Sequence, residues 1–262
     1  MLELTSIRNP LLQRVRRAAA TGGPTEEGLV VGEGPHLLEE AISGRWRVEQ
    51  VLATGEALER HHGLLSQVQA DVVRVSTRAL SAVADTKAPQ ELVVLLRPPT
   101  WAWVDLVSPA ALILILDSIQ DPGNAGTMVR SAEAFGASGV VFLRGSARVA
   151  NGKFMRATAG SILRLPYLEE VSVESARSEL TSRGVTLFAL AQGAPKALWE
   201  ADLKQRCALV VGNEGHGLSA GWKSGTESIS VPTSGVESLN AAVACSIVLF
   251  EAHRQRSSVE PI

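Results

Sequence analysis

The amino-acid sequence predicts an α/β protein in which a small α/β unit precedes a larger domain built on a parallel β-sheet. Up to residue 97, short strand and helix patterns alternate. From residue 110 the apolar runs are longer and continuous, which favours strands covered by helices on both faces of a sheet. Prolines between these regions interrupt both kinds of element. The predicted domains are residues 1–97 and 110–262, with residues 98–109 as a linker.

Apolar runs and turn residues divide the first unit into eight elements. A Gly-Gly-Pro sequence at residues 22–24 ends a basic helix, and Gly34 with Pro35 begins the next one. Aliphatic runs bounded by polar turns are typical of strands. We expect helices at residues 10–20, 35–42, 56–62 and 77–83 and strands at residues 29–31, 48–52, 72–75 and 92–96. No group of residues in this unit suggests catalysis.

The second domain contains four continuous apolar runs that predict buried strands. We expect strands at residues 112–116, 140–143, 186–190 and 209–211 and helices at residues 127–135, 173–182 and 238–253. Strands that alternate with helices in this way indicate a doubly wound α/β domain. The last helix is apolar on nearly all sides, which is typical of a helix buried within a domain or shared with a second subunit.

Composition argues against several classes of protein. The chain has 262 residues, of which 45% are hydrophobic, so we expect a fully folded protein. Aromatic residues make up only 4%, which argues against a single-strand binder built on rows of stacking rings. No apolar run approaches the roughly 20 residues of a membrane span, and none near the start suits a signal peptide. We therefore expect a cytoplasmic protein without membrane association.

Neither the cysteines nor the histidines suggest a metal site. Cys207 and Cys245 lie within apolar runs, as small buried residues of a protein in a reducing compartment do. The five histidines have no zinc-ligand spacing relative to these cysteines. We expect no bound metal.

The net charge of −2 gives the whole chain no basic signature for nucleic acid. Near the start, however, four arginines lie within ten residues of one another: Arg8, Arg14, Arg16 and Arg17. Such a cluster is equally compatible with contacts to RNA phosphates and with the solvated face of a helix.

A turn and a helix follow directly on the first buried strand of the second domain. Pro122 and Gly123 suit the turn, and Asn124 suits the helix N-cap. Arg130 lies nearly opposite the apolar stripe of this helix, on a face of small residues that a ligand can approach closely. The alternative is an ordinary surface ion pair between Arg130 and Glu133. The segment has neither the dinucleotide-binding spacing of glycines nor a P-loop.

Two later segments carry polar residues in apolar surroundings. After a buried strand, residues 212–217 form a glycine-rich loop in which Glu214 is the only charge, although a plain strand exit has the same pattern. Ser238 suits the N-cap of the last helix, with Glu237 near the positive end of its dipole, and a simple cap explains both. Asn240 follows among apolar residues, where an amide needs hydrogen-bond partners.

Together, residues 116–130, 210–219 and 229–240 resemble the three signature motifs of the SpoU family, in the family's order. Members of that family transfer a methyl group from S-adenosylmethionine to a ribose 2′-hydroxyl of RNA. The resemblance implies a SPOUT domain whose chain is threaded as a trefoil knot, which no sequence pattern could predict because knots are nearly absent from other proteins. More loosely, the first unit resembles the L30e-like substrate-binding domain of members that act on ribosomal RNA.

The resemblance also implies the residues of the site. The methyl donor would be bound by Gly212, Val231, Leu239, Gln192 and Gly193. The catalytic group would be Arg130, Asn124, Glu214, Ser238 and Asn240. Because a guanidinium is not readily deprotonated, we expect Arg130 to orient the hydroxyl and the adjacent phosphate and to stabilise developing alkoxide charge. Between Pro232 and Leu239 the chain is one residue shorter than the commonest family spacing.

The resemblance further implies the partners. Residues 153–164 are similar to a stretch in which the family has RNA-facing basic residues, so Arg156 is a candidate RNA contact; a structural arginine packed over the sheet edge is the alternative. Family members pair two subunits through their last helices, which implies a homodimer through the C-terminal domain. The expected substrate is 23S ribosomal RNA. Two other functions stay open: a catalytically inactive RNA-binding or ribosome-assembly protein, and a methyltransferase that confers resistance to a ribosome-targeting drug.

Overall fold

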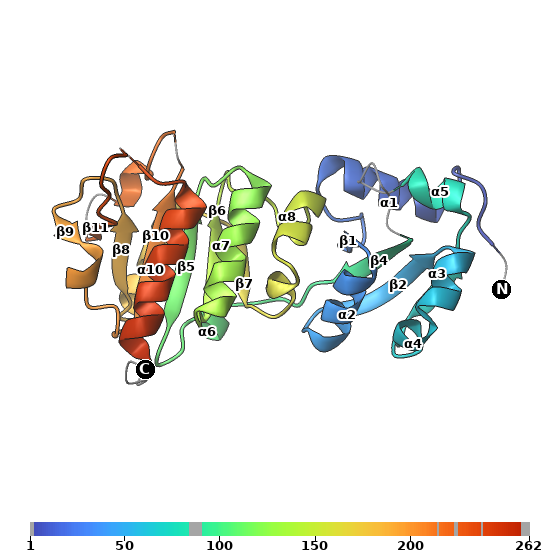
Figure 1. Cartoon of the computed structure of the whole chain (residues 1–262), viewed down its shortest axis with the longest axis horizontal. Helices are drawn as coiled ribbons and strands as arrows, with labels where there is room; N and C mark the ends of the chain where they lie inside the picture. Colours follow the sequence, from blue (N-terminus) through green and yellow to red (C-terminus); the bar gives the residue numbers. More distant parts are fainter. Residues whose placement is uncertain (1–2, 84–90, 214, 223–224, 237, 258–262) are drawn as a thin grey trace. The chain divides into compact units, whose positions relative to one another are not determined.

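The computed structural model describes residues 3–83, 91–213, 215–222, 225–236 and 238–257. The chain forms two compact units, which Figure 1 shows. The first unit comprises residues 1–100 and 148–164, and the second comprises residues 101–147 and 165–262. Residues 148–164, which follow the second domain's early strands in sequence, therefore pack with the first unit.

The first unit is built on a four-stranded sheet with the spatial order β1-β4-β2-β3. Strand β4 pairs with β1 and β2 in antiparallel fashion, whereas β3 pairs with β2 in parallel. The strands are β1 (Val30–Glu33), β2 (Arg47–Ala53), β3 (Asp71–Arg74) and β4 (Leu92–Arg97). The helices are α1 (Pro10–Thr21), α2 (Pro35–Ser43), α3 (Gly55–Arg60), α4 (His62–Leu65), α5 (Thr77–Ser81), α8 (Gly152–Ala157) and the 3₁₀-helix η1 (Ser161–Leu163). All eight predicted elements of this unit are present within a few residues of their predicted bounds.

Helix α1 shows how local sequence sets an element and its exposed face. The Asn9 side chain accepts a hydrogen bond from the Leu11 backbone N–H at 2.9 Å, and Pro10 supplies a first helical residue that has no N–H to satisfy. Gly22 ends the helix with a φ of 59°, a left-handed conformation that favours glycine. One face of α1 packs into the core, so the other face carries its arginines outward.

The second unit contains a seven-stranded sheet with the order β7-β6-β5-β10-β8-β11-β9, in which every neighbouring pair is parallel. The predicted parallel-sheet domain is therefore confirmed. Every residue of β5 and β6 is buried, as their continuous apolar runs predicted. The strands are β5 (Leu112–Asp117), β6 (Gly139–Leu143), β7 (Tyr167–Val171), β8 (Thr186–Leu190), β9 (Lys196–Ala197), β10 (Cys207–Gly212) and β11 (Glu227–Ser230).

The strand order creates a site at one edge of this sheet. From β5 the chain runs outward through β6 to β7 and then returns to build β8 to β11 on the other side of β5. At such a reversal the loops that follow the carboxyl ends of the strands diverge and leave a crevice for a ligand. The register aligns Gly212 with Asp117 and Val211 with Leu190, so the ends of β5, β10 and β8 coincide.

Two long helices, α7 (Pro122–Ala134) and α10 (Ala241–Arg256), lie side by side on one face of the second sheet (Figure 1). The hydroxyls of Ser131 on α7 and Ser246 on α10 form a hydrogen bond of 2.7 Å. The remaining helices of this unit are α6 (Trp103–Leu106), α9 (Val173–Ser182), η2 (Leu198–Glu200) and η3 (Ala220–Trp222). Helix α6 lies within the segment expected to be a linker, and its Leu106 is fully buried in the core of the second unit.

Both long helices begin at residues other than those predicted. Helix α7 starts at Pro122, and its N-cap is Asp121, whose carboxylate accepts a hydrogen bond of 2.8 Å from the Asn124 backbone N–H. The prediction of Asn124 as the cap was wrong because the fixed φ of proline suits the first helical position, so the cap precedes it. Helix α10 starts at Ala241 with Asn240 as its N-cap, and the prediction of Ser238 for that role was also wrong.

Candidate functional site

A cavity of about 770 Å³ lies at the carboxyl edge of the second sheet, within the range of about 300–1,000 Å³ usual for small-ligand sites. Its walls come from the residues that follow β8, β10 and β11 and from the start of α10. They are Leu190, Ala191, Gln192, Gly193, Val211, Gly212, Asn213, Gly217, Leu218, Ile229, Ser230, Val231, Pro232, Thr233, Ser238, Leu239, Asn240, Ala241 and Ala244. The cavity therefore collects segments that are far apart in the sequence.

All five residues predicted to bind the methyl donor line this cavity. They are Gln192 and Gly193 after β8, Gly212 at the end of β10, Val231 after β11, and Leu239 before α10. Most of these positions offer a small or aliphatic side chain, so polar contacts to a ligand would come largely from backbone groups. Their roles in binding stay a prediction.

Gly212 is required by the close approach of two backbone segments. A Cβ atom at this position would lie 2.5 Å from the carbonyl oxygen of Gly217, which no real Cβ contact tolerates. The neighbouring Asn213 exchanges backbone hydrogen bonds of 3.1 and 2.8 Å with Gly217, which closes the loop into a tight hairpin. Gly217 adopts a φ of 68°, so a second glycine is favoured there.

Two of the five residues predicted to be catalytic, Asn124 and Asn240, lie at the starts of α7 and α10 and contact each other. The Asn240 side chain donates a hydrogen bond of 3.3 Å to the side-chain oxygen of Asn124. Its own oxygen accepts from the backbone N–H groups of Ala242 and Val243, at 3.0 and 3.2 Å. The amide that sequence reasoning expected to need partners is thus fixed at the helix start, where it lines the cavity together with Ser238.

Arg130 lies on the exposed side of α7, six residues after Asn124. Within the part of the chain that the structure describes, no ion pair joins Arg130 to Glu133, so the alternative of a simple surface pair is not formed. Glu214, the fifth predicted catalytic residue, lies outside the described residues, as does Glu237. The geometry thus brings together Asn124, Ser238 and Asn240, with Arg130 on the same helix as the first of them.

The arginine cluster near the start divides into two pairs. Arg14 forms an ion pair of 2.7 Å with Glu27, and Arg17 forms one of 3.0 Å with Glu26. Arg8 and Arg16 are exposed, and among the described residues their side chains have no ion-pair partner. Two of the four arginines predicted to contact phosphates are therefore paired with glutamates of the first unit.

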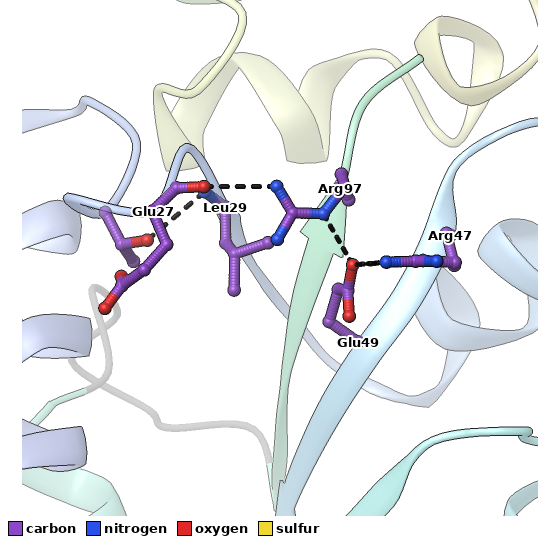
Figure 2. A network of polar contacts seen from close by, with 6 residues as sticks. Glu27, Leu29, Arg47, Glu49 and Arg97 are labelled. Atoms are coloured by element: carbon purple, nitrogen blue, oxygen red, sulfur yellow. Dashed lines mark hydrogen bonds and ion pairs between the residues drawn. The ribbon is translucent and has the colours of Figure 1, made fainter.

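A polar network that sequence reasoning did not single out joins the ends of β2 and β4 (Figure 2). The carboxylate of Glu49 accepts hydrogen bonds from Arg47 and Arg97, and the Arg97 guanidinium also donates to the Glu27 carbonyl at 3.1 Å. Arg47, followed by Arg97, lowers the pKa of Glu49. The pKa of Glu27 is lowered chiefly by a hydrogen bond from Thr25. Alternating charges along a strand edge are the signal that could have indicated this network.

Arg156, the last candidate for RNA contact, is exposed on α8 of the first unit. It lines a second cavity of about 250 Å³, which is bounded chiefly by β1, the start of α2 and α8. Arg164, in the same segment, forms an ion pair with Glu40.

The structure also bears on metal sites, membrane-spanning helices and the two cysteines. Within residues 3–83, 91–213, 215–222, 225–236 and 238–257, no group of three or more His, Cys, Asp or Glu side chains is arranged to hold a metal ion. In the same ranges, no helix has the length and apolar character needed to cross a membrane. Cys207 and Cys245 are free and buried, and burial raises the pKa of both thiols.

The fold and the cavity define an α/β protein with a large cavity at the carboxyl ends of β8, β10 and β11 in a parallel sheet. The model of the SpoU rRNA methylase family matches residues 111–250, and that of the MRM3-like substrate-binding domain matches residues 11–94. The chain belongs to the SpoU rRNA methylase family. The recognition drawn from the three motifs is therefore confirmed.

Relatives and solved structures resemble the chain over almost its whole length. It is 32% identical to the 23S rRNA (guanosine(2553)-2′-O)-methyltransferase RlmP of Bacillus subtilis, covering 95% of this chain and 98% of that protein. It is 33% identical to a tRNA/rRNA methyltransferase of Synechocystis over 97% of this chain and 94% of the relative. The SpoU methyltransferase AviRb of Streptomyces viridochromogenes, solved with S-adenosylmethionine (AdoMet), is 26% identical with a TM-score of 0.86, covering 97% of this chain and 100% of that one.

Proposed function

We propose that this protein transfers a methyl group from S-adenosylmethionine to a ribose 2′-hydroxyl of 23S ribosomal RNA. The observation that carries the proposal is that Gly212 from the second motif and Val231, Leu239 and Asn240 from the third line the same cavity of about 770 Å³. Asn240 also reaches the first motif through its hydrogen bond to Asn124. The name of RlmP, which specifies 2′-O-methylation of 23S rRNA, supports the same reaction.

The residues of the cavity fit the methyl donor. Gly212 lets the Gly217 backbone pack closely against it, and the loops after β8, β10 and β11 offer backbone N–H and C=O groups on several sides. A donor bound here supplies an electrophilic methyl group on a sulfonium. The AviRb structure contains this donor, which supports assigning it to the same cavity in a chain of the same fold.

In the proposed mechanism, Arg130 orients the ribose hydroxyl and the adjacent phosphate. A guanidinium keeps its proton in proteins, so it stabilises the negative charge that develops on the oxygen and does not act as the base. When a donor is bound, the new C–O bond would form as the C–S bond of the sulfonium breaks, and the hydroxyl proton would pass to solvent water. Asn124, Ser238 and Asn240 position the reacting groups, and Glu214 completes the predicted catalytic set. In-line placement of oxygen, methyl carbon and sulfur supplies much of the rate. The Asn240 amide is held in one orientation by its hydrogen bond at the start of α10, so it can position a reacting group without first being ordered.

We also propose that the first unit binds the RNA and that the second unit performs the chemistry. Arg8 and Arg16 are the best candidates for phosphate contacts, since Arg14 and Arg17 are partly neutralised by glutamates. Arg156 is a further candidate. The enzyme would act in the cytoplasm, where ribosomal RNA is found. The trefoil knot implied by the motifs stays a prediction.

A homodimer through the second unit is supported by an apolar stripe on α10. Val243, Ile247 and Phe250 are 49%, 36% and 52% exposed and lie on one side of the helix at spacings of four and three residues. The Phe250 ring contacts the Phe135 ring edge-on at 5.6 Å, which extends the apolar surface to the end of α7. We propose that a second copy of the chain covers this stripe. Sedimentation of the protein and of Phe250→Ser would test it: the proposal expects a dimer that the substitution dissociates.

The proposed reaction is tested by incubating the protein with methyl-labelled donor and 23S ribosomal RNA, followed by nuclease digestion. We expect label on the ribose of one nucleotide. Label on a base, or donor binding with no transfer, would contradict the proposed reaction, and the second result would favour the inactive RNA-binding protein.

A further inference from the structure

The buried carboxylate of Asp117 has an arrangement that the proposed mechanism does not use. Asp117 is the last residue of β5, is 1% exposed, and stands opposite Gly212 of β10. Its two oxygens accept hydrogen bonds from one residue, Ser219: 2.6 Å from the backbone N–H and 2.7 Å from the hydroxyl. A buried carboxylate is costly unless donors compensate it, so this pair of bonds is a strong constraint on where Ser219 lies.

A second contact fixes the other end of the same loop. The Asn213 side chain donates a hydrogen bond of 2.9 Å to the carbonyl of Ser118, the residue after Asp117. Its oxygen accepts from the Gly215 backbone N–H at 2.8 Å. Ser118 has a φ of 59°, a left-handed conformation unusual for a residue other than glycine, and this turns its carbonyl away from the strand direction. Both ends of the loop are therefore attached to the end of β5.

This loop is a wall of the large cavity. Asn213, Gly217 and Leu218 line the cavity, whereas neither Asp117 nor Ser219 does. On its other side, Asp117 leads within four residues to Asp121, the cap of the helix that carries Asn124 and Arg130. Asp117 thus lies between the loop that forms a wall of the cavity, which it contacts through Ser219, and the start of α7.

We propose that Asp117 is a positioning residue for the reaction: through Ser219, and together with the Asn213 contact, it holds Asn213 and residues 215–219 in the arrangement that binds the methyl donor. The inference rests on the proposed function, since it assigns the donor to this cavity. A purely structural role predicts lower stability with unchanged donor affinity. A positioning role predicts weaker donor binding, because the two bonds from Ser219 (2.6 and 2.7 Å) are much shorter than the bond of 3.4 Å that the hydroxyl of the adjacent Ser118 donates to the same carboxylate.

The test measures AdoMet affinity by calorimetry on the full chain without RNA, together with thermal unfolding. Asp117→Asn keeps the size of the side chain but turns one acceptor into a donor, and we expect the dissociation constant to rise by about 10- to 100-fold. Ser219→Ala loses only the hydroxyl bond and should weaken binding by about 3- to 10-fold. Ser219→Thr restores a hydroxyl and should restore the affinity.

Ser138→Ala is the matched control. The Ser138 hydroxyl donates to the carbonyls of Leu106 and Leu112 at 2.7 and 3.2 Å, at the opposite end of β5. This variant should lower the unfolding temperature and leave donor affinity unchanged. If Asp117→Asn does not fold, the comparison of Ser219→Ala with Ser219→Thr and Ser138→Ala decides the question.

The outcomes separate the two proposals. A wild-type chain that does not bind AdoMet overturns the proposed function. A wild-type chain that binds it, with Asp117→Asn and Ser219→Ala binding equally well, overturns the positioning role alone. Loss of affinity in Ser219→Ala that Ser219→Thr does not restore would likewise contradict it.

Discussion

In the first unit, charged groups near the strand ends pair with one another, whereas in the second unit polar groups at the strand ends bind loops. The Glu49 carboxylate accepts hydrogen bonds from Arg47 and Arg97 on two neighbouring strands, so these charges compensate one another on the surface of the first unit. Asp117 instead binds a residue 102 positions later in the chain, and this shapes a cavity. Under the proposed function, the donor chemistry belongs to the second unit. Equivalent changes in the two units should therefore have unequal effects on activity.

The largest effect is expected for Arg130→Ala. Under the proposed mechanism, removing the guanidinium removes the group that stabilises developing charge, so kcat should fall by at least about 100- to 1,000-fold, with little change in AdoMet affinity. Steady-state kinetics and calorimetry measure the two quantities. Arg183→Ala, which removes an exposed arginine paired with Glu179 on α9, is the control and should leave kcat unchanged. Undiminished turnover in Arg130→Ala would remove this residue from the mechanism.

A pair of glycine substitutions compares the units directly. In Gly212→Ala the new methyl would meet the Gly217 carbonyl at 2.5 Å, so the loop must shift, and the dissociation constant for AdoMet should rise by about 10-fold or more. In Gly63→Ala, within α4 of the first unit, the methyl meets no atom within 4 Å. That variant should bind the donor as the wild type does. Equal affinities for the two variants would show that the loop at Gly212 does not shape the donor site.

Two asparagine caps separate stability from activity. Asn9→Ala and Asn240→Ala each remove a helix N-cap and should each lower the free energy of unfolding by about 1 kcal/mol. Only Asn240→Ala also removes the contact with Asn124, so only it should reduce methyl transfer. Chemical denaturation and a transfer assay measure the two effects. Equal loss of transfer in both variants would mean that stability alone explains the result.

The smallest effect is expected in the first unit. Arg16→Ala should weaken RNA binding by a few-fold and reduce the slope of log affinity against log salt by about 0.7 to 0.9 if this side chain contacts one phosphate. Arg60→Ala removes an arginine that lies between Glu56 and Glu91 in the same unit, and it should leave that slope unchanged. An unchanged slope in Arg16→Ala would identify this arginine as part of a solvated helix face.

Sequence reasoning was most successful where one physical signal dominates. Continuous apolar runs located β5 and β6, which are buried throughout, and α9 was predicted with its observed bounds. Strand β7 was missed because it lies at the sheet edge and carries the exposed Glu169 and Glu170, which break the apolar run. The N-cap of α7 was placed at Asn124 because Pro122 was assigned to the turn, and that of α10 was placed at Ser238 because both Ser238 and Asn240 are suitable cap residues.

The contacts that shape the site could not be predicted, because they join residues that are distant in sequence. Nothing near Asp117 indicates Ser219 as its partner, and nothing in residues 148–164 indicates that they pack with the first unit. The resemblance to the family motifs did predict residues of the cavity. All five residues that it implied as donor contacts line the cavity.

The most direct test of the central claim uses an RNA substrate with 2′-deoxyribose at the one nucleotide where label is found. If Arg130 faces a sugar oxygen beside the methyl donor, the deoxy substrate should bind the enzyme with nearly unchanged affinity and accept no label. Label transferred to the deoxy substrate at the same nucleotide would contradict the account, because the acceptor could not then be the ribose hydroxyl.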